Sequence, residues 1–96
     1  MHNHKINKKY DVFWENGQAV ITIPEGTKKI DYGEFMEVSR LSKVILPSSL
    51  VEIGNFAFAY CSDLIEIEIP GSVKELKFQT FEGCKKLKKV VLNEGL

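Results

Sequence analysis

Hydrophobic residues recur along most of this chain at a constant interval of 23 residues. The clearest markers are Pro24, Pro47 and Pro70, and Asn93 takes the next position in the series. Each marker follows a short segment whose first and third residues are hydrophobic. Because residues two apart point to the same side of a strand, this pattern predicts four strands with one buried face each, at 21–23, 44–46, 67–69 and 90–92.

Other hydrophobic columns keep the same interval without gaps. The most regular column holds Phe35, Phe58 and Phe81. One repeat cannot bury its apolar face alone, so residues one period apart are expected to stack in successive coils, with the phenylalanines at the centre. The further columns are Ile30, Ile53 and Leu76; Val38, Cys61 and Cys84; Leu41, Leu64 and Leu87; and, less strictly, Thr27, Leu50, Val73 and Leu96.

The strand regions share the pattern Leu-x-x-Val/Ile-x-Leu/Ile, which begins at Leu41, Leu64 and Leu87. The second repeat then continues with Pro47, Leu50, Ile53-Gly54, Ala57-Phe58 and Cys61. These motifs, with a period inside the leucine-rich-repeat range of roughly 20–29 residues, resemble the BspA-like leucine-rich repeat over residues 20–96. The other repeats depart from this pattern at Asp31, Glu34, Val38, Lys77 and Thr80.

The resemblance implies an α/β solenoid, that is, a short right-handed coil with a parallel sheet on one face. We expect short helical turns on the other face, with the segment 56–60 as a helical turn or short helix whose aromatic residue plugs the coil. The resemblance also implies protein binding and no catalytic residues, and it is common among cell-surface or secreted proteins.

The N-terminal part of the repeat region is predicted to be a capping β-hairpin. Asn16-Gly17 is a strong two-residue turn signal, so residues 10–14 should pair with residues 18–23. Phe13 or Trp14 would cover the first coil, and a binding role for Trp14 is the alternative. The resulting division is a polar leader at 1–9 and one domain at 10–96, with a cap at 10–19, repeats at 20–42, 43–65 and 66–88, and a partial repeat at 89–96.

The C-terminal end of the repeats carries no such cap in the sequence. Residues 90–96 supply a fourth strand without the following Ile and Phe positions. Phe81, Val90 and Leu92 would therefore lie at an open apolar end beside an unpaired strand edge, which favours association. We predict a two-fold homodimer through these residues; the alternative is that the chain is part of a longer array.

The outward positions of the strands form the second candidate interaction surface. They are Thr22, Lys43, Ile45, Glu66, Glu68, Lys89 and Val91. Lys43, Glu66 and Lys89 fall in one column with alternating charge, so neighbouring strands can form exposed ion pairs, each worth at most about 1 kcal/mol. Ile45 and Val91 are hydrophobic where solvent is expected. The sheet face is thus predicted to dock a protein partner, and a merely solvated face is the alternative.

Charge gives little support to other partners. The 96 residues carry 13 basic and 13 acidic side chains, which cancel, so no general attraction to nucleic acid or an anionic membrane is expected. The only basic cluster, residues 85–89, lacks the interleaved aromatics of a nucleic-acid site. No apolar run is long enough to span a bilayer. The polar start predicts a cytoplasmic protein, or a secreted or cell-surface one if the chain belongs to a longer parent.

Few residues suggest chemistry. Cys61 and Cys84 share a column with Val38, which indicates small buried core positions with free thiols; a disulfide is the alternative. His2 and His4 lie in the polar leader, so neither a metal site nor a catalytic triad is expected, and no cofactor is predicted. The sequence therefore predicts a non-catalytic interaction module that docks a partner on its sheet face or C-terminal end. The alternatives are a small inhibitor that occludes a larger enzyme or complex, or a structural fragment of a surface array.

Overall fold

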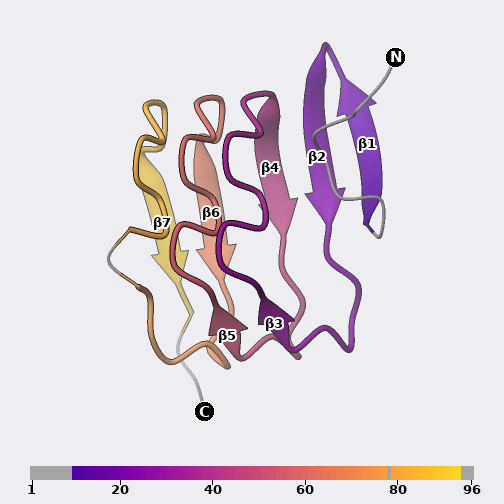
Figure 1. The fold of residues 1–96 in the computed structure, drawn as a ribbon. Coiled ribbons are helices and arrows are strands. Elements are labelled where there is room, and N and C mark those ends of the chain that lie inside the picture. The colour runs from indigo at the N-terminus through magenta and orange to yellow at the C-terminus, as the bar shows by residue number, and fades with distance from the viewer. Residues whose placement is uncertain (1–9, 78, 94–96) are drawn as a thin grey trace.

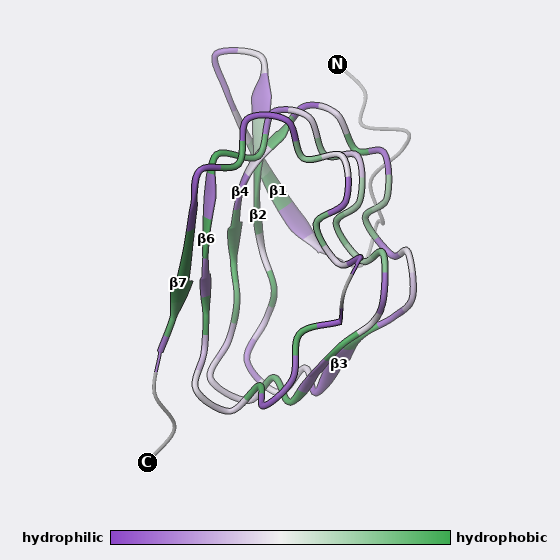
Figure 2. Cartoon of the chain, turned by 90° about the vertical axis from the view of Figure 1, so that its left-hand side faces the viewer, coloured by the Kyte–Doolittle hydropathy of each residue, from purple (hydrophilic) through white to green (hydrophobic). Residues whose placement is uncertain are grey.

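The chain folds as a stack of similar coils, with the longer strands on one side and turns with two short strands on the other (Figures 1 and 2). The computed structural model describes residues 10–77 and 79–93. The first, second and third coils begin with β2, β4 and β6, and β7 follows the third. The strands are β1 (Asp11–Glu15), β2 (Gln18–Thr22), β3 (Lys29–Ile30), β4 (Leu41–Ile45), β5 (Glu52–Ile53), β6 (Glu66–Ile69) and β7 (Lys89–Leu92).

The core runs through the middle of the stack, where residues 23 apart pack on one another. The rings of Phe35 and Phe58 lie 5.5 Å apart at 3°, and those of Phe58 and Phe81 lie 5.9 Å apart at 10°. Buried strand residues such as Ile21, Val44 and Ile67 close the core from the sheet side. Burying one such side chain stabilises the fold by roughly 1.5–3 kcal/mol. The predicted repeat and its phenylalanine column are therefore confirmed.

The side opposite the strands is built from turns, and the predicted helical turns were wrong. No helix occurs in residues 10–77 or 79–93. The N–H groups of Glu34, Met36 and Val38 bond to the carbonyl three residues earlier, whereas those of Phe35 and Glu37 bond to Ala57 and Ala59 in the next coil. Every second N–H group of this segment thus donates to the neighbouring coil. In a helix, each of these N–H groups would instead donate to a carbonyl of the same segment.

The predicted hairpin is present, but its lid is a different residue. Strands β1 and β2 pair antiparallel across Asn16-Gly17, both of which adopt positive φ. Tyr10 is buried against Phe35, with the rings 5.3 Å apart, and its hydroxyl donates to Glu34 at 2.7 Å. Phe13 and Trp14 are 63% and 41% exposed, because Phe13 points outward and Trp14 lies at the far end of the hairpin. The predicted leader, residues 1–9, lies outside the described residues.

The parallel sheet is interrupted between the second and third coils. Strand β2 pairs with β4, β3 with β5, and β6 with β7, but β4 and β6 do not form a hydrogen-bonded ladder. The close approach of the first two coils needs Gly54, where a Cβ would lie 2.5 Å from the Tyr32 nitrogen. Lys77 takes this place in the third coil, and residues 75–76 form no strand with β5. The third coil therefore carries a side chain at the position where the second coil has none.

Candidate functional site

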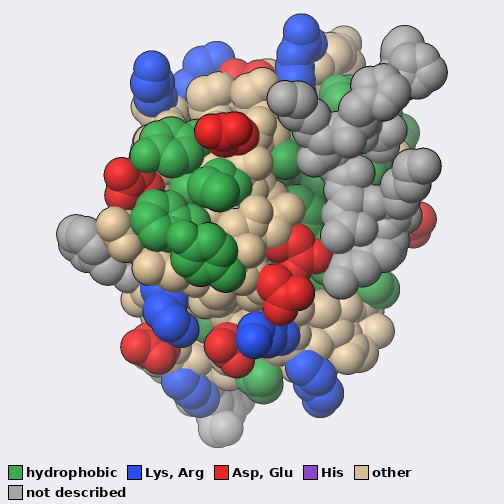
Figure 3. All heavy atoms as spheres, in the orientation of Figure 1, with side chains coloured by type: hydrophobic (Ala, Val, Ile, Leu, Met, Phe, Trp, Pro, Cys, Tyr) green, Lys and Arg blue, Asp and Glu red, His purple; other side chains and the backbone are tan. Residues whose placement is uncertain are grey.

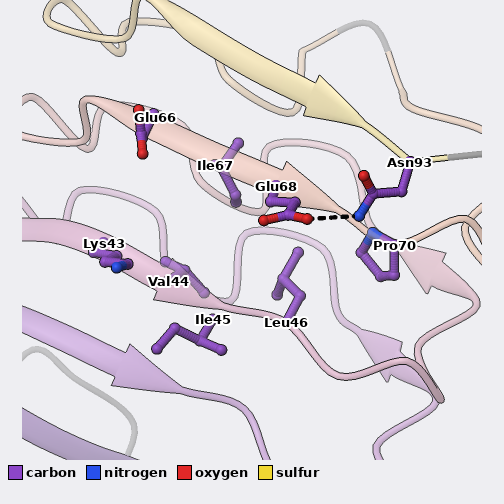
Figure 4. A pocket seen from close by; sticks show the side chains of 9 residues that line it. All are labelled: Lys43, Val44, Ile45, Leu46, Glu66, Ile67, Glu68, Pro70 and Asn93. Atoms are coloured by element: carbon purple, nitrogen blue, oxygen red, sulfur yellow. Dashed lines mark hydrogen bonds between the residues drawn. The ribbon is translucent and has the colours of Figure 1, made fainter.

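A groove lies on the sheet face where the sheet is interrupted. It runs between β4 and β6 and has a volume of about 290 Å³. Figure 4 shows that both strands and the residue after β7 contribute side chains. The lining residues are Lys43, Val44, Ile45, Leu46, Glu66, Ile67, Glu68, Pro70 and Asn93.

Strand alternation decides which side chains form the floor and which form the rim. Val44 and Ile67 are buried and form the floor. The intervening side chains point outward, and Ile45 keeps 45% of its surface exposed. Four of the seven residues predicted for the sheet face therefore line this groove, namely Lys43, Ile45, Glu66 and Glu68.

The other three predicted residues flank the groove on neighbouring strands. Thr22 lies beside Ile45 in the β2–β4 register. Lys89 lies beside Glu66, and Val91 beside Glu68, in the β6–β7 register. They share the sheet face without lining its hollow, so a docked segment would reach them only by crossing β4 or β6.

The charged rim residues are not neutralised by one another, because the ion pairs that the sequence allows do not form among the described residues. In the part of the chain that is described, no ion pair joins Lys43 to Glu66 or Glu66 to Lys89. Exposed ion pairs contribute little to stability in water. In addition, β4 and β6 are not hydrogen-bonded to each other, so Lys43 and Glu66 are not held side by side. Glu68 accepts a hydrogen bond from the Asn93 side chain at 2.8 Å, which fixes one of its oxygens and adds no positive charge.

The backbone also leaves polar groups at the edges of the groove. The Ile23 N–H donates to the Ile45 carbonyl at 2.9 Å across the β2–β4 boundary. One coil later, the equivalent Leu46 N–H makes no backbone hydrogen bond to Glu68 or any other described residue. The Leu46 donor and the Glu68 carbonyl therefore face the interruption and need water or a ligand as a partner.

Comparison with known proteins agrees with the repeat geometry. The sequence model of the BspA type leucine rich repeat region (6 copies) matches residues 6–96. The chain belongs to the BspA-type leucine-rich-repeat family. A search of curated proteins gave no significant match.

A solved structure similar to this BspA-type chain is that of a leucine rich cell surface protein from Faecalibacterium prausnitzii A2-165. The two sequences are 19% identical, and the TM-score is 0.40. The match covers 90% of this chain and 38% of the other. The chain therefore spans well under half the length of that protein.

The C-terminal end of the BspA-type stack exposes residues whose equivalents are buried. Val90 and Leu92 are 38% and 63% exposed, whereas Ile67 and Ile69 are each 2% exposed. Leu92 also lines a hollow of about 170 Å³ with Ile69, Val73 and Leu76. Phe81, the third residue predicted for self-association, is half-buried and stacks on Phe58.

The two cysteines of this BspA-type protein are core thiols that hydrogen-bond to the preceding coil. Both are free. The Cys61 sulfur lies 3.1 Å from the Phe35 carbonyl oxygen, and the Cys84 sulfur lies 3.0 Å from that of Phe58. Burial raises the pKa of the Cys61 thiol to about 12 and also raises the pKa of Cys84. Neither thiol is therefore poised as a nucleophile at neutral pH.

The described part of the chain covers residues 10–77 and 79–93. These ranges contain no group of three or more His, Cys, Asp or Glu side chains that could hold a metal ion. They also contain no helix with the length and apolar character needed to cross a membrane.

Sequence reasoning missed an exposed aromatic cluster on the turn side. Figure 3 views this side and shows a compact hydrophobic group; its members are Tyr32, Met36, Phe56 and Tyr60. The rings of Tyr32 and Phe56 lie 5.6 Å apart, and the neighbouring Glu82 raises the pKa of Tyr60. The available signal was the placement of two aromatic residues, Phe56 and Tyr60, two positions either side of the buried Phe58. Both adopt positive φ in this turn.

Proposed function

We propose that this chain is a non-catalytic protein-interaction module that docks a partner on its sheet face, centred on the β4–β6 groove. The observation that carries the proposal is the groove itself. It gathers an apolar wall at Ile45, unneutralised charges at Lys43 and Glu66, and the unpaired Leu46 N–H in one place. Specific docking needs such a combination of apolar surface and directional polar groups.

The family and the charge pattern add support. Leucine-rich repeats present their sheet as an extended surface, and repeat stacks are suited to binding. Residues 43–93, which build the groove, carry six acidic and seven basic side chains, so the negative charge of the groove is local to Glu66 and Glu68 on β6. Two exposed carboxylates on one strand favour a basic partner surface and select against an acidic one.

A display library of random peptides tests this proposal, because it samples many partner sequences at once. Peptides are selected on the wild-type chain and then measured on a sheet-face variant with Lys43, Ile45, Glu66 and Glu68 changed to Ala. A turn-face variant, with Tyr32 and Met36 changed to Ser, is the matched control. Both variants must retain the wild-type circular dichroism and melting temperature.

We expect most selected peptides to bind at least tenfold more weakly to the sheet-face variant and unchanged to the turn-face variant. The opposite outcome, binding lost only on the turn-face variant, would place the docking surface on the Tyr32 cluster and overturn the proposal.

We further propose that the 96-residue chain self-associates through its C-terminal end. Support comes from the exposure of Val90 and Leu92 beside β7, which pairs only with β6 among the described strands. A two-fold contact would pair two β7 edges antiparallel and cover these side chains. Sedimentation should give twice the mass of one chain at high concentration, and Leu92→Lys should halve it. A mass of one chain at every concentration would contradict this proposal.

A further inference from the structure

The groove carries an excess of negative polar groups along the β6 side. Glu66 and Glu68 project from the same strand and are exposed, and neither takes part in an ion pair within the described residues. The backbone adds a further acceptor. Since the Ile65 and Ile69 carbonyls accept from Lys88 and Asn93 in the direction of β7, alternation turns the Glu68 carbonyl toward β4.

The opposite wall offers a different surface. Ile45 presents an exposed aliphatic side chain from β4, between Lys43 and the Leu46 N–H (Figure 4). The groove therefore has an anionic side, an apolar side and one backbone donor. Figure 4 also shows the Glu68 carboxylate with one oxygen bound to Asn93 and the other directed away from it.

We infer that the β4–β6 groove binds the arginine side chain of an extended segment of a partner protein. This inference rests on the proposed docking function and names the chemistry of the docked group. The guanidinium would donate to the Glu66 and Glu68 carboxylates and to the Glu68 carbonyl, while its methylene stem packs on Ile45. A carbonyl of the same segment would accept from the Leu46 N–H.

The dimensions and donor count favour arginine over other ligands. A groove of about 290 Å³ lies at the lower limit of small-molecule sites, roughly 300 Å³, and suits one long side chain. Arginine provides five donors in a planar fork and sheds water more readily than lysine, so it satisfies several acceptors at once. Lys43 would repel a second basic residue of the bound segment at its end of the groove. Such a residue is therefore tolerated only at the other end, which fixes the direction in which the segment binds.

An NMR titration with blocked pentapeptides tests the inference. The probe is acetyl-Thr-Val-Arg-Val-Thr-amide, and the matched probes replace arginine by citrulline, which keeps the shape and removes the charge, or by lysine. The ¹⁵N-labelled wild-type chain is titrated with each peptide. The same titrations are made on the double variant Glu66→Gln, Glu68→Gln and on a control variant Glu52→Gln, Glu75→Gln, whose acids form only weak exposed ion pairs.

We expect the arginine peptide to shift the amide signals of Ile45, Leu46 and Glu68. The citrulline peptide should bind at least tenfold more weakly, the lysine peptide a few-fold more weakly, and Glu66→Gln with Glu68→Gln should lose at least tenfold. Lys43→Ala should strengthen arginine binding a few-fold. Equal binding of citrulline and arginine, or an unchanged affinity of the Glu66→Gln, Glu68→Gln variant, overturns the inference.

The display library separates this inference from the docking function on which it rests. Sheet-face binders without arginine would overturn the inference and leave the docking function intact. Binders that all map to the turn face would overturn both.

Discussion

The aromatic rings of Phe35 and Phe58 lie almost parallel, 5.5 Å apart at 3°, although the residues are one full repeat apart in sequence. Phe58 has a phenylalanine on each side, while Phe81 has one on a single side and is only half-buried. We therefore expect Phe58→Ala to lower the free energy of unfolding by about 3–5 kcal/mol and Phe81→Ala by about half as much. Urea denaturation measures both, with exposed Phe13→Ala as a control near zero. Equal losses of unfolding free energy in Phe58→Ala and Phe81→Ala would contradict the conclusion that Phe81 packs on one side only.

Tyr10 should matter more to the cap than either aromatic residue of β1. Tyr10→Ala removes the ring packed on Phe35 and the hydrogen bond to Glu34, and should lower the free energy of unfolding by about 3 kcal/mol. Tyr10→Phe removes only the hydrogen bond and should lose about 1 kcal/mol. Trp14→Ala should lower the free energy of unfolding, measured by urea denaturation, less than Tyr10→Ala does. A larger effect at Trp14 would restore it as the lid.

Gly54 should be intolerant of a side chain for steric reasons. An added Cβ would lie 2.5 Å from the Tyr32 nitrogen and 2.6 Å from the Asp31 carbonyl carbon, and backbone atoms cannot move aside as side-chain atoms do. Gly54→Ala should therefore lower the free energy of unfolding by about 3 kcal/mol. Gly26→Ala is the matched control, because a Cβ added at Gly26 would meet no atom within 4 Å and only the positive φ of this residue opposes a side chain. This substitution should lower the free energy of unfolding by about 1 kcal/mol. Thermal melting compares the two.

Lys77→Gly should close the groove. The substitution places in the third coil the glycine that the second coil has at Gly54, where it allows close approach to the first coil. Strands β4 and β6 should then come close enough to form a hydrogen-bonded ladder. The Leu46 amide should then exchange with deuterium at least tenfold more slowly, while the Ile23 amide, already hydrogen-bonded, keeps its rate. Binding of the arginine peptide should weaken in parallel. Unchanged exchange at Leu46 would show that the interruption has another cause.

Stability should fall in alkali because of the buried thiols. The pKa of Cys61 is raised from an ordinary value near 9 to about 12, so folding favours the protonated thiol. This contribution is complete below pH 9 and is lost as the pH rises through about 12. Urea denaturation across this window should show a smaller decline for Cys61→Val, since Val38 occupies the same column. Tyr10, whose pKa is also raised, should leave a residual slope, and an unchanged slope in Cys61→Val would contradict the assignment.

Features set by the hydrophobic period could be read from the sequence. The Phe35 column, the hairpin at Asn16-Gly17 and the outward position of Ile45 all follow from spacing within or between repeats. Features that depend on a partner in the next coil could not be read. The turn at Phe35 has a composition compatible with a helix, but the bonds of Phe35 and Glu37 to the next coil and the positive φ of Glu37 rule the helix out.

The groove shows the same limit. Lys43, Ile45, Glu66 and Glu68 were predicted to share a face, and they do. We attribute the break that makes a hollow between them to Lys77, at the opposite side of the coil, and the Lys77→Gly variant tests this attribution. Its sequence signal, a lysine where the second repeat has Gly54, was visible, but the backbone approach that gives it meaning appears only in three dimensions.

At the turn around the phenylalanine column, the hydrogen bonds between neighbouring coils run in one direction, although elsewhere a bond such as that from the Asp63 N–H to the Ser39 carbonyl runs the other way. Phe35 and Phe58 donate forward to Ala57 and Thr80, and the last such donors, Phe81 and Gly83, meet no acceptor in the described residues. At this turn each coil donates to the next coil in the sequence, so the N–H donors point to the following coil and the carbonyl acceptors point to the preceding one. A coil added in the same orientation continues this series, whereas an inverted copy sets donors against donors. A two-fold contact between two chains therefore gains no backbone hydrogen bonds at this turn and would have to form them elsewhere, as along β7.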